Sequence, residues 1–98
     1  MTNPRATAYR RVLQTIRDIG PAKLWPAEQG CIREAADALL FCQDLGHDAD
    51  ARAAVAAVTR LADDLIDAER MTPMRGHRLL DDIWACGPSA LLDLPVAA

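Results

Sequence analysis

Cysteine, aromatic residues and long apolar runs are all scarce in this sequence, and each scarcity excludes a kind of protein. The three cysteines are an odd number without a C-x-x-C pair, a pattern that favours reduced thiols over a disulfide framework. The first residues, MTNPRATAYRR, hold no apolar segment of the kind that a signal peptide requires. We therefore expect a cytoplasmic protein with free thiols.

The apolar runs are too short for a membrane span. The longest one in the expected helices covers residues 53–59 between two arginines, whereas a span needs about 18 to 20 apolar residues. A net charge of −3 and an isoelectric point near 5.2 give the chain as a whole no electrostatic reason to bind nucleic acid. Membrane insertion is excluded, and nucleic-acid binding would need a local basic patch.

Alanine and arginine are the residues that the chain has in abundance. Alanine supplies 19 of the 98 residues, which favours close approach of helices, and arginine outnumbers lysine ten to one. Both biases are typical of a GC-rich bacterial genome. The length supports one domain over residues 1–98.

Prolines, glycines and capping residues divide the chain into helices. Four pairs mark helix starts: Asn3-Pro4, Trp25-Pro26, His47-Asp48 and Thr72-Pro73. Three stop signals follow the first, second and fourth helices: Gly20-Pro21, Gly46 and Gly87-Pro88. The predicted helices cover residues 4–19, 26–45, 49–70 and 73–86. We predict an all-α fold, a compact antiparallel four-helix bundle, with a three-helix core crossed by the first or last helix as the alternative.

Apolar residues at helical spacing give each predicted helix a buried stripe. The four stripes consist of Ala8, Tyr9, Val12, Ile16 and Ile19; of Glu28, Ile32, Ala35, Ala36, Leu39, Cys42 and Gln43; of Ala51, Ala54, Val55, Val58, Leu61, Ala62, Leu65 and Ile66; and of Leu80, Ile83 and Trp84. His77 falls on the inner edge of the fourth stripe. Before the second helix, we expect Leu24 or Trp25 to pack back as a hydrophobic staple.

Two apolar features fall outside these stripes. Phe41 points roughly opposite to the stripe of its helix, and Leu40 is also off it. Residues 89–98 form an apolar tail that we expect to dock, and its large side chains are Leu91, Leu92, Leu94 and Val96. Such features suit docking of a helix or peptide into a groove. The sequence therefore predicts a small non-catalytic bacterial protein–protein interaction module, an adaptor, regulator or accessory subunit that binds another protein or a second copy of itself.

The segment from Asp63 to Asp67 has the form D-D-x-x-D and resembles the first aspartate-rich motif of isoprenoid diphosphate synthases. The resemblance implies that Asp63, Asp64 and Asp67 hold Mg²⁺ against a diphosphate through hard oxygen ligands. On a helical wheel, Asp63 and Asp67 fall roughly 140° and 180° from the stripe centred on Val58, so they face out of the bundle. A solvated acidic face, or an acidic patch for a partner, is the competing interpretation.

Glu34 and Asp37 form an E-x-x-D followed by an apolar run, which resembles one of the two acidic motifs of the all-α nucleotide pyrophosphohydrolases. The resemblance implies a Mg²⁺-dependent nucleotide or diphosphate hydrolase, which we keep as the alternative function. The second motif of that family, E-E-x-x-E, is not found upstream of residue 34. We therefore assign no catalytic residue, no metal and no cofactor from the sequence.

The first helix is locally basic, because it contains Arg5, Arg10, Arg11 and Arg17. A patch of Arg10, Arg11 and Arg17 makes nucleic-acid binding through this helix a second alternative. Charge complementarity with the aspartate-rich ends of the third and fourth helices, or with a second copy, accounts for the same arginines.

Overall fold

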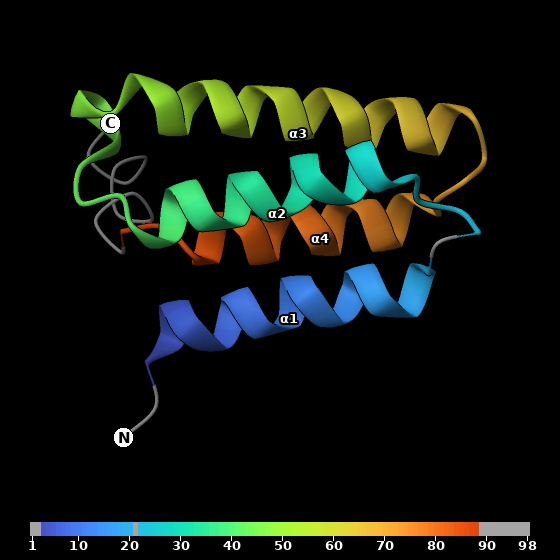
Figure 1. The fold of residues 1–98 in the computed structure, drawn as a ribbon, viewed down its shortest axis with the longest axis horizontal. Helices are drawn as coiled ribbons and strands as arrows, with labels where there is room; N and C mark the ends of the chain where they lie inside the picture. Colours follow the sequence, from blue (N-terminus) through green and yellow to red (C-terminus); the bar gives the residue numbers. More distant parts are fainter. Residues whose placement is uncertain (1–2, 21, 89–98) are drawn as a thin grey trace.

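Four α-helices make up most of the structure, a computed structural model that describes residues 3–20 and 22–88. They are α1 (Pro4–Ile19), α2 (Pro26–Leu40), α3 (Ala49–Asp67) and α4 (Pro73–Ala85), and a short 3₁₀ turn, η1 (Leu45–His47), precedes α3. Successive helices run antiparallel along the long axis, and α2 and α4 lie between α1 and α3 (Figure 1). α1 packs on both middle helices from one side, and α3 packs on them from the other. The predicted all-α four-helix bundle is confirmed.

The helix starts lie at the residues that the sequence predicts. The side chain of Asn3 accepts hydrogen bonds from first-turn N–H groups of α1. Asp48 does the same for α3 at 2.9 Å and Thr72 for α4 at 3.2 Å. At α2 the direction is reversed, because Glu28 accepts a hydrogen bond from the backbone N–H of Trp25 at 2.9 Å. These bonds satisfy donors that would otherwise lack a partner at a helix start or just before it.

The end of α2 comes earlier than predicted, at Leu40 rather than residue 45. Arg5 reaches from α1 to the carbonyl oxygens of Leu39 and Leu40, which the last turn of a helix leaves without partners. Gly46, the predicted stop signal, lies in η1, where its N–H donates to the side chain of Asp44 at 2.9 Å. The chain therefore leaves the helix six residues before the glycine.

The ends of α3 and α4 are also earlier than predicted, at Asp67 rather than residue 70 and at Ala85 rather than residue 86. α3 closes with the two hydrogen bonds of a Schellman motif. The N–H of Arg70 donates to the carbonyl of Leu65 at 2.9 Å, and the N–H of Glu69 donates to that of Ile66 at 3.0 Å. Glu69 occupies the left-handed position of this motif with a φ of 60°, a place that glycine usually fills.

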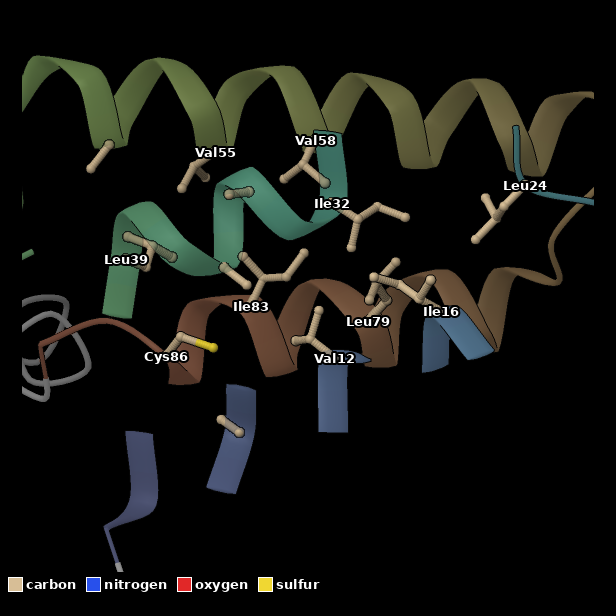
Figure 2. Packing of buried hydrophobic residues seen from close by; sticks show 14 of the residues in the cluster. Val12, Ile16, Leu24, Ile32, Leu39, Val55, Val58, Leu79, Ile83 and Cys86 are labelled. Carbon is tan, nitrogen blue, oxygen red and sulfur yellow. The ribbon is translucent and has the colours of Figure 1, made fainter. Parts of the chain in front are cut away.

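The core lies between the four helices and is filled by aliphatic side chains from each of them (Figure 2). The buried members of the first three predicted stripes are Ala8, Val12, Ile16, Ile32, Ala35, Ala36, Leu39, Cys42, Ala51, Val55, Val58, Ala62 and Leu65. Leu24 is completely buried while Trp25 is 62 % exposed, so Leu24 is the staple. No helix in the described part of the chain is long and apolar enough to cross a membrane.

The line of residues that α4 turns toward the core matches the prediction only in part: Ile83 is buried as predicted, and Leu80 is half-buried against the core. Leu79 and Ile83 are buried, whereas Trp84 is 37 % exposed and His77 is exposed. Asp82 is buried on the same side, where its carboxylate accepts a hydrogen bond from Arg11 of α1 at 2.9 Å. With Asp82 turned toward α1, Trp84 and His77 fall on the outer side of α4.

Candidate interaction groove between α1 and α2

A groove with a volume of about 430 Å³ lies between α1 and α2. On each helix the lining residues recur every four positions, as Tyr9, Leu13 and Arg17 do on α1, because this spacing places side chains one turn apart on the same face. The described residues that line the groove are Tyr9, Leu13, Ile16, Arg17, Gly20, Gln29 and Arg33. Two parallel rows of side chains therefore face each other across it.

A hydrogen bond joins the two helices beside one end of the groove. The hydroxyl of Tyr9 donates to a carboxylate oxygen of Asp37 at 2.5 Å. This bond, together with burial and the charge of Asp37, raises the pKa of Tyr9, so the phenol stays protonated and remains a donor at neutral pH. Asp37 follows Arg33 at the next i+4 position of α2, so the bond fixes the row on α2 relative to the row on α1.

Arg17 and Arg33 face the groove with free guanidinium groups. Both residues are exposed, and neither side chain has a hydrogen-bond or ion-pair partner within residues 3–20 and 22–88. The side chain of Gln29, in contrast, donates to the carbonyl of Leu24 at 2.9 Å and is held in place. The floor between the arginines is apolar, because Leu13 is half-buried and Ile16 is 5 % exposed.

Four other arginines have structural partners, and one of them is Arg52, which donates to the carbonyl oxygens of Leu45 and Gly46 at 2.8 Å. Arg5 donates to four backbone carbonyl oxygens at 2.6 to 2.9 Å. Arg11 pairs with Asp82 of α4, and Arg70 donates to both carboxylate oxygens of Glu28 at 2.5 and 2.9 Å. Arg17 and Arg33, in contrast, have no hydrogen bond of this kind among the described residues.

The basic residues predicted to form one patch on α1 have different surroundings in the structure. Arg10 is exposed, Arg11 turns to α4, and Arg17 lines the groove on the side of α2. Arg11 and Arg17 therefore face different neighbours.

Phe41 lies next to the groove row of α2. It follows Asp37 at i+4, and its N–H donates to the carbonyl of Asp37 at 3.2 Å, which continues the helical spacing. The side chain is 80 % exposed, and Leu40 beside it is half-buried. The other predicted interface residues, Leu91, Leu92 and Leu94, lie outside the described residues.

The carboxylates that the two motif resemblances single out do not come together. Glu34 lines a hollow on the α3 side of α2, beside Cys31 and Asp50, whereas Asp37 is bonded to Tyr9 on the α1 side. Asp63, Asp64 and Asp67 are exposed on α3. Across the part of the chain that the structure describes, no three His, Cys, Asp or Glu side chains gather closely enough to hold a metal ion.

The three thiols lack the environment of a nucleophile. Burial raises the pKa of Cys31, Cys42 and Cys86, and that of Cys86 rises to about 11. The thiolate is the reactive form, so little of it exists near neutral pH. None of these three thiols therefore has the lowered pKa of a reactive cysteine.

Comparison with known proteins adds no relative. No protein family, curated protein or solved structure matches this chain. Sequence reasoning anticipated Phe41 and Arg17, but not Leu13, Gln29 or Arg33. Their i+4 spacing on each helix is visible in the sequence, whereas the pairing of the two rows needed the fold.

Proposed function

We propose that this chain is a small non-catalytic protein–protein interaction module of the bacterial cytoplasm, which acts as an adaptor, regulator or accessory subunit. The observation that carries the proposal is Phe41, an aromatic side chain that is 80 % exposed at the end of α2. Burying a phenylalanine side chain contributes about 1.5 to 3 kcal/mol, so an exposed one can supply binding energy to a partner.

The backbone around Phe41 is held in place by Arg5. The guanidinium donates to the carbonyl oxygens of Leu40 and Cys42, the residues on either side of Phe41, at 2.9 and 2.8 Å. A side chain on a fixed backbone loses less conformational entropy on binding than one on a loose segment. This preorganisation supports Phe41 as an anchor for the proposed partner, which is another protein or a second copy in a homodimer.

The proposal is tested with Phe41→Asp, and Met74→Asp serves as its matched control. Met74 is 73 % exposed on α4, so its replacement adds the same charge at an exposed apolar site on another helix. We expect Phe41→Asp to reduce the molar mass of the assembly, measured by chromatography with light scattering, or to abolish capture of a specific host protein measured by quantitative mass spectrometry. Helical content, measured by circular dichroism, should be unchanged in both variants.

Met74→Asp should leave both the mass and the captured proteins as in the wild type. If Phe41→Asp also matches the wild type in both measurements, Phe41 is not an interface residue and the proposal is wrong.

A further inference from the structure

We propose that the groove between α1 and α2 binds an acidic amphipathic segment of a partner protein. An apolar side chain of that segment packs on Leu13 and Ile16, and its carboxylates pair with Arg17 and Arg33. The inference rests on the proposed function, since it assumes an interaction module, and it adds the chemistry of the partner.

The charge of the partner follows from the two guanidinium groups. Arg17 and Arg33 are exposed, and no hydrogen bond or ion pair joins either one to another described residue. The described lining holds no acid, and Asp37, the next residue of the row on α2, already accepts a hydrogen bond from Tyr9. A guanidinium matches the two oxygens of a carboxylate in a bidentate pair. A segment with carboxylates therefore complements the groove, whereas a basic one would be repelled.

The apolar part of the partner follows from the floor. Ile16 is 5 % exposed and Leu13 is half-buried, so an aliphatic side chain placed between the arginines would meet carbon atoms on both sides. Docking of an amphipathic helix uses such apolar anchors inside a groove and charges at its rim. A nucleic acid would engage the arginines but leave this apolar floor unused.

The length of the partner segment follows from the length of the two rows of side chains that line the groove on α1 and α2. From Tyr9 to Arg17 the groove extends over eight helical residues, which is about 12 Å or two turns. The row on α2 continues from Arg33 through Asp37 to Phe41, again at i+4 spacing. A segment of three to four turns would therefore cover both the groove and Phe41.

The probe is a synthetic 16-residue helical peptide with leucines at i, i+3, i+4 and i+7 and glutamates flanking them. A second peptide carries lysine in place of every glutamate, and a third carries serine in place of every leucine. Each is titrated into the isotopically labelled full chain, and amide chemical shifts report both the site and the affinity. Arg17→Glu with Arg33→Glu is compared with Arg10→Glu with Arg60→Glu, which changes the net charge equally at exposed positions outside the lining.

We expect the acidic leucine peptide to shift the amide signals of Leu13, Ile16 and Arg33. The groove double variant should bind it at least tenfold more weakly than the wild type, while the control double variant should lose less than threefold. The lysine peptide and the serine peptide should each bind at least tenfold more weakly than the acidic leucine peptide. Affinity should also fall as salt is raised, because the arginines are exposed.

Four results would overturn the inference. The first is equal affinity of the acidic and lysine peptides, and the second is equal loss in the two double variants. The third is tighter binding of a 12-nucleotide oligo-dT than of the acidic peptide, which would make the groove a nucleic-acid site. The fourth is protection of the amides of residues 89–98 from exchange in the free chain, if this protection disappears in the groove double variant. Such a result would mean that the C-terminal tail, from the same chain or from a second copy, occupies the groove.

The two proposals fail in different ways. In one outcome, Phe41→Asp no longer assembles or no longer captures the host protein, while the groove double variant still does both and binds the acidic peptide as the wild type does. The proposed interaction module is then supported, and the groove inference is wrong. If neither variant changes any of these measurements, both proposals fall.

Discussion

The guanidinium of Arg5, in the first turn of α1, donates to the carbonyl oxygen of Leu39 at 2.6 Å, which joins residues 34 positions apart in the sequence. The same group also reaches the carbonyl oxygens of Leu40, Cys42 and Cys86. One side chain therefore supplies hydrogen-bond donors to the C-terminal ends of α2 and α4. A cation at these ends also meets the partial negative charge of two helix dipoles.

Replacing Arg5 with methionine should destabilise the protein by about 2 to 4 kcal/mol, because a charge-assisted hydrogen bond contributes about 1.5 to 3 kcal/mol and several carbonyls lose their donor together. Urea denaturation measures the free energy of unfolding. Amide exchange should also become faster near Cys42. Arg10→Met is the control, since Arg10 is exposed, and it should change stability by less than about 0.5 kcal/mol. An equal effect of the two substitutions would contradict the role of Arg5.

Helix starts could be predicted from the sequence because their signals act locally. Asn3, Asp48 and Thr72 each bond to N–H groups two or three positions ahead, so the relevant residues are adjacent in the chain. The end of α2 could not be predicted, because part of the hydrogen bonding that closes it comes from Arg5, on another helix. Trp84 was misplaced because the side of α4 that is buried, which carries Leu79 and Ile83, depends on how the helix packs in the bundle.

The groove was only partly predictable from the sequence. The periodicity of Leu13 and Arg17, and of Gln29 and Arg33, places each pair on one face of its helix. Which two helices lie side by side is a property of the whole bundle, so the sequence could not show that these faces meet. Phe41 was predictable because its departure from the stripe depends on its own helix alone.

Stability should depend on pH through Glu28. Its pKa is held below its ordinary value of 4.5, first by the hydrogen bonds from Arg70 and then by the backbone N–H of Trp25. The unfolded chain therefore binds a proton more readily than the folded one, so the contribution of Glu28 is complete well above pH 4.5 and is lost as the pH falls through the lowered folded-state pKa. Glu28→Gln should lower stability by about 1 to 3 kcal/mol at pH 7 and by progressively less below pH 4.5.

Urea denaturation of the wild type and Glu28→Gln at several pH values between 7 and about 3 measures this difference. Glu34→Gln is the matched control, because Glu34 is exposed. Its effect on the free energy of unfolding at pH 7 should be small. If the free energies of unfolding of the wild type and Glu28→Gln differ by the same amount down to pH 3, the stabilisation by the Glu28–Arg70 pair does not depend on the ionisation of Glu28.

The thiols should react in a fixed order with iodoacetamide. Cys31 is half-buried, whereas Cys42 and Cys86 are buried and the pKa of Cys86 is about 11. Alkylation needs an accessible thiolate, so at pH 8 we expect Cys31 to be modified first and the other two to react mainly through unfolding. Peptide mass spectrometry over time measures each site. Adding denaturant should make the three rates similar, and faster modification of Cys86 than of Cys31 in the native protein would contradict the prediction.

Replacing Glu69 with glycine should stabilise the protein. Glu69 holds a φ of 60° at the end of α3, where a residue with a side chain is strained and glycine is not. The free energy of unfolding should rise by about 0.5 to 1 kcal/mol. The larger conformational entropy of glycine in the unfolded chain offsets part of the stabilisation that comes from removing the backbone strain. Glu69→Ala separates the two effects, since alanine removes the carboxylate but keeps the Cβ that causes the strain. Urea denaturation should therefore show stabilisation for Glu69→Gly and none for Glu69→Ala, and equal stabilities of the two variants would mean that the conformation at residue 69 costs nothing.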